Sequence, residues 1–267
     1  CSSSTTAVAD NNTITFNAMA DGTYENCTIR VADSASNTSD NLSVSSFTID
    51  STAPTLTEVT PVPTYTNDNT SLSYTFSSSE AGTIAYGGSC SSSTTEATVD
   101  NNTIIFNALA EGNYTNCKIS VTDNLSNTSD NLSVSSFTID MTAPTLDNVT
   151  IASSNSVSTL AKTSDRITLS ITSVGAIQAP SVKIAGQTAT VGSSSDNITW
   201  SAYYDMQSSD SEGTVSLNIG FSDLAGNPGD NVTSTTGNAT SVLFDKTPPT
   251  LDNVTIASSN SVSTLAK

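Results

Sequence analysis

The four cysteines of this 267-residue chain fall into two pairs, Cys1 with Cys27 and Cys90 with Cys117. Three kinds of chemistry are open to them: disulfides, reduced thiols in a core, and ligation of a metal. The sequence has no histidine and no close C-x-x-C pair, so it lacks the usual pattern of a zinc site. We favour a disulfide within each pair, because the composition described below is typical of a secreted protein. Such a bond would stabilise a small core by roughly 3 to 4 kcal/mol.

Acidic and amide side chains recur at matching places and offer the hard oxygen ligands that calcium prefers. Three aspartates end an apolar stretch just before a proline-containing joint, and three others begin a loop that is closed by an asparagine; together these predicted ligands are Asp33, Asn37, Asp50, Asp123, Asn127, Asp140, Asp223, Asn227 and Asp245. Glu80 is a further candidate. The competing interpretation is that they supply hydrogen bonds to turns. We expect calcium beside Asp140, with Asp123 and Asn127 contributing.

Catalysis has little support in the sequence. The absence of histidine removes the commonest general base, and no carboxylate pair lies in a recognisable motif. We therefore expect no enzymatic activity. Trp200, Tyr203 and Tyr204 could form a platform for a sugar, but the alternation of the segment places Trp200 on a core face, which favours packing.

The composition indicates an extracellular protein made of β-strands. Serine and threonine are abundant, only 12% of the residues are charged, and the net charge of −18 would repel nucleic acid and anionic lipid. No apolar run is long enough to span a bilayer, so we expect no membrane insertion in this segment, with any export or anchoring signal lying outside it.

Two stretches occur twice. "SNTSDNLSVSSFTID" spans residues 36–50 and 126–140, and "PTLDNVTIASSNSVSTLAK" spans 144–162 and 249–267. The distance between copies is close to the size of a small domain, so the array repeats whole domains. Boundaries at Asp50, Asp140 and Asp245 predict a partial module at 1–50, complete modules of two types at 51–140 and 141–245, and the start of another second-type module at 246–267.

Apolar residues alternate within each complete module, which predicts β-strands rather than disorder. In the first module we predict strands near 55–60, 71–77, 81–86, 102–107, 113–122 and 132–139. In the second we predict them near 147–152, 166–172, 181–185, 187–191, 197–204, 214–222 and 239–244. Six or seven short strands in about a hundred residues are typical of a two-sheet Greek-key sandwich, with a barrel as the weaker alternative.

The runs "LAEGNYTNCKISVTDNLSN" at 109–127 and "SEGTVSLNIGFSDLAGN" at 211–227 resemble the "G-x-Y…V-x-D-x-x-G-N" signature of bacterial immunoglobulin-like repeats, the modules of giant secreted adhesins. The segment "FSSSEAGTIAYGGSC" and the "D-x-T-x-P-T-L" joints are similar to the same family. The resemblance covers nearly the whole chain. It implies an all-β fold of tandem immunoglobulin-like Greek-key sandwiches joined by short proline-containing linkers, and a cell-surface or extracellular location.

One local irregularity follows from residue spacing alone. Tyr114 and Asp123 are separated by an odd number of positions, whereas Val215 and Asp223 are separated by an even number, which places the latter two on one face of a strand. We predict that the first module type absorbs the extra residue in a β-bulge around Thr115 to Cys117.

Three functions fit this sequence. The first is a structural spacer in a surface fibre or adhesin, whose partners are the neighbouring modules of its own chain. The second is an adhesin module that binds a glycan or a protein through loops at one end of a sandwich. The third is a subunit that self-associates into filaments by strand exchange between chains.

Overall fold

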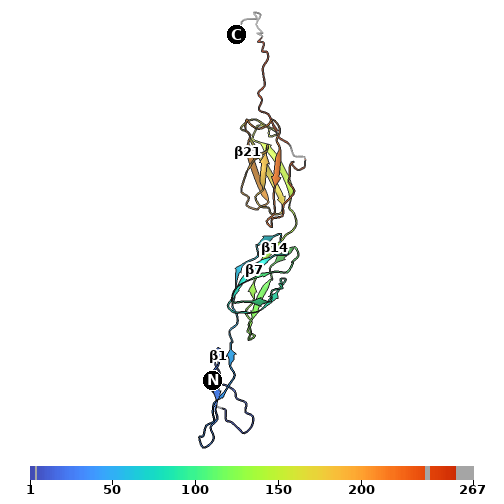
Figure 1. Ribbon diagram of the computed structural model, residues 1–267. Coiled ribbons are helices and arrows are strands. Elements are labelled where there is room, and N and C mark those ends of the chain that lie inside the picture. Colours follow the sequence, from blue (N-terminus) through green and yellow to red (C-terminus); the bar gives the residue numbers. More distant parts are fainter. Residues whose placement is uncertain (4, 238–240, 257–267) are drawn as a thin grey trace. The chain divides into compact units, whose positions relative to one another are not determined.

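The computed structural model describes residues 1–3, 5–237 and 241–256, and within them the chain consists of strands and turns without a helix. It divides into two compact units, Cys1–Ile139 and Asp140–Lys267 (Figure 1). None of the described segments is an apolar helix of a length that could cross a bilayer. In the predicted further module, residues 246–256 form no strand, and residues 257–267 lie outside the described part.

The first unit contains a two-layer sandwich after residue 50. One layer is an antiparallel sheet in the order β10 (Asp100–Ile105), β7 (Ser73–Ser78) and β5 (Leu56–Thr60). The other layer contains the order β13 (Leu132–Ser133), β12 (Lys118–Thr122), β8 (Gly82–Gly87) and β9 (Glu96–Ala97), and it continues as β11 (Gly112–Tyr114), β14 (Phe137–Ile139) and the parallel strand β6 (Tyr65–Thr66).

The second unit repeats this arrangement. Its first layer has the order β15 (Thr145–Ser153), β17 (Arg166–Val174), β21 (Thr199–Asp205) and β20 (Thr190–Val191). Its second layer has β19 (Gln187–Thr188), β18 (Ser181–Ile184) and β23 (Leu217–Gly220), together with β16 (Leu160–Ala161), β24 (Leu243–Phe244) and β22 (Gly213–Thr214).

In both units the chain crosses between layers as it passes from one long strand to the next. β7 lies in one layer, β8 in the other, β10 returns to the first, and β12 returns to the second. This is the connectivity of an immunoglobulin-like Greek-key sandwich, so the predicted fold class is confirmed. Each sandwich has a separate hydrophobic core, with Phe76 and Ile119 at the centre of one and Leu169 and Ile219 at the centre of the other.

Residues 1–50 form a hairpin rather than a sandwich. β1 (Gly22–Tyr24) pairs with β4 (Phe47–Ile49), and β2 (Thr28–Ile29) pairs with β3 (Leu42–Ser43). Among the described residues of this segment only Cys27 is buried. Val31 is 46% exposed, whereas its counterpart Val121 in the complete module is fully buried, because β12 packs against a second layer.

Most predicted strands are present, but the sequence missed β6, β9 and β16, which are two residues long and carry no readable alternation. The segment predicted as one strand at 187–191 is two strands that belong to different sheets, β19 and β20. Of the strand predicted at 239–244, only β24 forms within the described residues, since 238–240 lie outside them.

The predicted β-bulge at Thr115 to Cys117 is wrong. Tyr114 pairs with Phe137, and Lys118 pairs with Ser133, so the register is the same before and after the irregularity. Between the paired segments, residues 115–117 lie opposite residues 134–136, so both strands contain a three-residue interruption, or step, at the same level. The core side chains at this step are Tyr114 and Cys117 on one strand and Val134 and Phe137 on the other. A bulge was not needed, because the partner strand contains the same extra residue.

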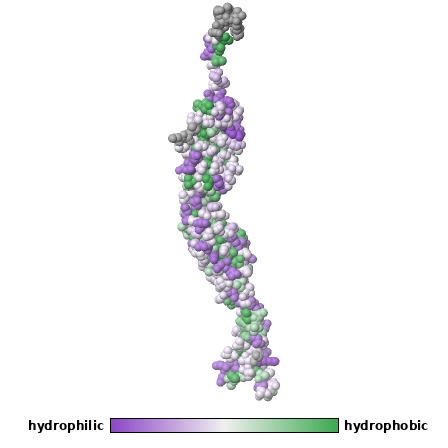
Figure 2. All heavy atoms as spheres, turned by 180° about the vertical axis from the view of Figure 1, so that it is seen from behind, coloured by the Kyte–Doolittle hydropathy of each residue, from purple (hydrophilic) through white to green (hydrophobic). Residues whose placement is uncertain are grey.

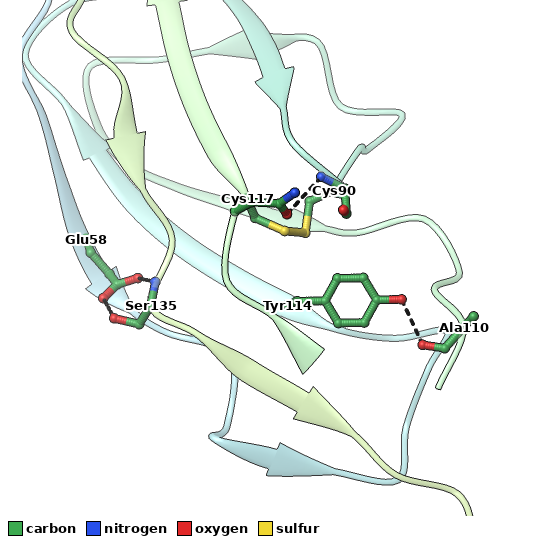
Figure 3. Close-up of a disulfide and its surroundings, with 8 residues drawn as sticks. Glu58, Cys90, Ala110, Tyr114, Cys117 and Ser135 are labelled. Carbon is green, nitrogen blue, oxygen red and sulfur yellow. Dashed lines mark hydrogen bonds between the residues drawn. A yellow bond between two sulfur atoms is a disulfide. The ribbon is translucent and has the colours of Figure 1, made fainter. Parts of the chain in front are cut away.

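This double step leaves main-chain groups between β13 and β14 without a ladder partner. Glu58 of β5 fills the gap: its carboxylate accepts hydrogen bonds from the amide of Ser135, at 2.9 Å, and from the Ser135 hydroxyl (Figure 3). The carboxylate reaches across from the other layer. The step is therefore stabilised by a cross-layer contact, as unpaired main-chain donors require.

Both cysteine pairs are joined by disulfides, Cys1 to Cys27 and Cys90 to Cys117. Cys117 lies in the step between β11 and β12, and the bond ties it to the segment that follows β8 (Figure 3). The Tyr114 hydroxyl donates to the carbonyl of Ala110 at 2.8 Å, which fixes the turn that leads into β11. The second sandwich has neither the disulfide nor this tyrosine.

We expect the Cys90–Cys117 bond to stabilise the first sandwich alone. Replacing both cysteines by alanine should lower its free energy of unfolding by about 3 to 4 kcal/mol, because the bond closes a loop of 27 residues. Circular dichroism would follow the whole chain, and fluorescence of Trp200, the single tryptophan, would follow the second sandwich as an internal control. An unchanged first transition, or a shifted Trp200 transition, would contradict this assignment.

Candidate functional site

The loop after β12 is closed by one aspartate and one asparagine. The Asp123 carboxylate accepts the amides of Leu125 and Asn127 on one oxygen, at 2.8 and 2.9 Å, and the Asn127 side-chain amide on the other, at 2.8 Å. Ser126 adopts a φ of 73°, and the second unit has Gly226 at the matching position with a φ of 96°. The loop is thus a compact, internally bonded turn.

The same asparagine also holds the joint that precedes its own sandwich. The Asn127 side-chain amide donates to the main-chain carbonyl of Asp50 at 3.0 Å. In the second unit, Asn227 donates in the same way to the carbonyl of Asp140 at 2.7 Å. Each loop therefore fixes the entry of the chain into its sandwich.

Our expectation that Asp123 and Asn127 gather with Asp140 is wrong. β14 runs back antiparallel to β11 and ends with Ile139 opposite Gly112, so the chain reaches Asp140 at the other end of the strand pair from Asp123. The partner of Asp123 at its own end is Asp50. The Asp123 loop of the first sandwich is hydrogen-bonded to the preceding joint at Asp50, and Asp140 is hydrogen-bonded to the loop of Asp223 and Asn227.

Three carboxylates converge at the entry of the first sandwich. Asp50, Glu80 and Asp123 each place an oxygen within 4.8 Å of the other two, and all three residues are partly buried. They line a surface depression together with small and apolar residues, which include Ala81, Val99 and Leu125. We call Asp50, Glu80 and Asp123 the entry triad.

The oxygens of the entry triad are close enough together to ligate one calcium ion. Two oxygens on opposite sides of an ion, each about 2.4 Å away, are about 4.8 Å apart. The residues present thus fit a hard divalent cation, with carboxylate ligands from a joint, a strand connection and a loop. In the part of the chain that the structure describes, no other group of three such side chains comes this close.

The carboxylates of the triad differ in their electrostatics. The Asn127 side chain and nearby amides hold the pKa of the Asp123 carboxyl below its usual range. The pKa of Glu80 is raised, first by burial and then by repulsion from Asp50 and Asp123. Glu80 is therefore the member whose negative charge is least favourable when no cation neutralises the group.

The second unit has the loop but lacks the third acid. Asp223 and Asn227 are 5% and 8% exposed, and Gln178 donates to the Asp223 carbonyl at 3.0 Å. The hydroxyl of Ser78 donates to the carbonyl of Glu80, and that of Ser173 donates likewise to Gly175, so glycine occupies the position of Glu80. Among the described residues, this grouping of three carboxylates therefore occurs only in the first sandwich.

The remaining predicted ligands are placed separately. Asp33 and Asn37 form the same closed loop in the hairpin, with the Asn37 amide 2.9 Å from the Asp33 carboxylate. Asp245 accepts the amide of Thr247 at 2.9 Å, as Asp50 and Asp140 accept those of Thr52 and Thr142. These contacts match the turn-forming interpretation of the joint aspartates.

Sequence reasoning missed two other acids at the joints, Asp21 and Glu212. Each directly precedes a glycine that begins a strand, and each accepts hydrogen bonds from residues just after a joint aspartate. The recurring acid-glycine pair at 21–22, 111–112 and 212–213 was the available signal.

The aromatic platform is not free to stack on a sugar as a unit. Trp200 is 7% exposed and lies in the core, as expected. The Arg166 guanidinium covers the ring of Tyr203 at 4.0 Å and pairs with Asp205 at 2.7 Å. The Tyr204 hydroxyl donates to Asp210. These residues serve packing and surface contacts within the second sandwich.

No protein-family model and no curated protein matches this chain. Among solved structures, it is similar to the D00-D0 domain of Intimin, with 16% identity, 72% of this chain and 100% of that chain covered, and a TM-score of 0.28.

We expect Glu80→Gln to raise the melting temperature of the first sandwich at pH 7 in chelator. A carboxyl whose folded-state pKa is raised stabilises the fold at low pH and loses that contribution as pH rises through the raised value, so the gain should vanish below about pH 4. Melts followed by circular dichroism check this. Glu25→Gln removes the same charge from the exposed hairpin, and an equal gain there would point to net charge instead of the triad.

Proposed function

We propose that this chain is a spacer segment of a repetitive extracellular fibre or adhesin, in which folded modules are joined by short linkers that are hydrogen-bonded to the modules themselves. The observation that carries the proposal is the repeated bond from a loop asparagine to the joint carbonyl, Asn127 to Asp50 and Asn227 to Asp140. A spacer needs such held joints at each repeat, whereas a binding module needs only one specialised end.

The surface supports the same function. On the face shown in Figure 2, hydrophobic residues form small separate groups among polar ones in both units. Exposed apolar side chains of this scattered kind are ordinary for a soluble surface and mark no docking area. The disulfides and the net charge of −18 suit an oxidising exterior, where a repulsive surface keeps neighbouring fibres apart.

The spacer proposal predicts that the loop asparagines limit motion at the joints. Small-angle scattering of the full chain should show a wider distribution of end-to-end distances for Asn127→Ala with Asn227→Ala than for the natural sequence. Asn131→Ala with Asn231→Ala is a control that makes the same change elsewhere in the chain. A distribution unchanged by the first pair would contradict held joints.

A glycan array probed with the full chain addresses the binding alternative. The spacer proposal expects no bound glycan. Saturable binding that maps to loop residues at one end of a sandwich would replace it with the adhesin function, and concentration-dependent growth of long polymers would replace it with strand exchange between chains.

The second part of the proposal is that the entry triad binds calcium and stiffens the joint at Asp50. Burial and repulsion from Asp50 and Asp123 raise the pKa of Glu80, and a bound cation would remove the repulsion. It would also link the joint, a strand connection and a loop through one ion. An ion that binds only the folded state adds about 2.7 kcal/mol of stability at a hundredfold excess over Kd.

Millimolar calcium should therefore raise the melting transition of the first sandwich and leave the Trp200 transition of the second unmoved, since glycine replaces Glu80 there. Asp50→Asn with Glu80→Gln should abolish the response. If both transitions rise together, or if neither does, the triad is not a calcium site and its members only form turns.

A further inference from the structure

The residues that follow the joint at Asp50 are bound by a carboxylate from the hairpin before it. The Ser51 hydroxyl lies 2.9 and 3.0 Å from the two carboxylate oxygens of Asp21, and the Thr52 hydroxyl donates to the same carboxylate at 3.1 Å. The Thr52 amide meanwhile donates to Asp50 at 3.0 Å. Consecutive linker residues are thus fixed to the end of the structure they leave.

The same arrangement appears at the exit of the second sandwich with different residues. Glu212 accepts the amide of Lys246 at 2.9 Å and the hydroxyl of Thr247 at 2.7 Å. The Lys246 ammonium donates to the carbonyls of Ser208 and Asp210, at 2.9 and 2.8 Å. Five hydrogen bonds therefore hold Lys246 and Thr247, the fifth being the bond from the Thr247 amide to the Asp245 carboxylate.

A glycine sets the orientation of each of these acids. Asp21 precedes Gly22, with a φ of 146°, and Glu212 precedes Gly213, with a φ of 122°. An L-amino acid with a side chain rarely adopts these values, although no atom lies within 4 Å of an added Cβ at either position. The glycines are needed for backbone conformation, which lets the strand begin while the preceding carboxylate faces the linker.

We infer that Asp21 and Glu212 are positioning residues, through which each folded element sets the direction of the chain toward the next module. The hydrogen bonds that each of these carboxylates accepts from the two residues after the joint aspartate form an exit clamp, which acidification releases. The inference rests on the spacer proposal for its biological meaning. It differs from the asparagine contact, because the clamp belongs to the element before the joint and the asparagine belongs to the sandwich after it.

The clamp is strongest when its carboxylates are ionised, because hydrogen bonds to a charged acceptor are roughly twice as strong as those to a neutral one. Hydrogen bonds from the linker lower the pKa of both acids: from Ser51 first in the case of Asp21, and from the Thr247 hydroxyl first in the case of Glu212. The positive charge of Lys246 also favours the ionised form of Glu212, and at the Asp21 clamp the Thr52 amide donates to the carboxylate of Asp50. The clamp is complete above the ordinary carboxyl range and is lost as pH falls through the lowered values.

A spin label just beyond the second clamp tests this inference in the full chain. Thr250→Cys adds one free thiol, since all four natural cysteines are paired, and Pro248 and Pro249 transmit any change of direction at Thr247 to the label. At pH 7 the label should show slow, restricted motion in the otherwise natural sequence. Glu212→Gln should make it several-fold faster, and Glu212→Asp should restore part of the restriction.

The pH profile separates a clamp from a merely structural residue. In the natural sequence the label should become mobile as pH falls below the ordinary glutamate pKa of about 4.3, whereas in Glu212→Gln it should be mobile throughout. Glu96→Gln, an equal change of charge in the first sandwich, should leave the profile unchanged. Trp200 fluorescence monitors the fold of the second sandwich at each pH.

A label whose motion is the same in Glu212→Gln as in the natural sequence, while Trp200 reports a folded sandwich, would overturn the clamp. So would a loss of restriction that tracks unfolding of the sandwich instead of preceding it. Neither result depends on the scattering and glycan experiments, so the clamp and the spacer function can fail separately.

Discussion

The structure depends most on how a short linker satisfies its main-chain groups where one folded element passes into the next. A joint of a few residues has no strand partner of its own, and a partly buried carbonyl without a donor costs free energy. The loop asparagine answers this need at Asp50 and at Asp140, because its amide can donate to the loop carboxylate and to the joint carbonyl at once. One side chain thereby couples the internal order of a loop to the path of the linker.

Acidic residues in this chain act mainly as acceptors for main-chain and hydroxyl donors. Asp123 closes a loop, Glu58 completes an interrupted ladder, and Asp21 and Glu212 bind linker residues. Only Lys162 with Asp165 and Arg166 with Asp205 form ion pairs among the described residues. The large negative charge is thus distributed into hydrogen-bonded positions, and the entry triad is the place where three carboxylates approach one another.

The two module types solve the same folding problem with different means. The first has a double three-residue step in its last two long strands, and it uses the Cys90–Cys117 bond, the Tyr114 hydroxyl and the Glu58 carboxylate around that step. The second keeps Val215, Leu217 and Ile219 in unbroken alternation, and it adds β20 to the edge of its first layer. Identical joint contacts on unlike sandwiches indicate that the joints, more than the module interiors, define the repeat.

The sequence by itself determined the fold class and most strands, because alternation of apolar residues reports which face of a strand is buried and needs only local spacing. It also determined that Val215 and Asp223 share a face, and both are buried. Only the tertiary structure decided which ends meet. Asp123 lies with Asp50 and not with Asp140, since the antiparallel return of β14 carries the chain to the opposite end. Likewise, the odd spacing after Tyr114 could not reveal a matching step in the partner strand, because register is a property of the pair.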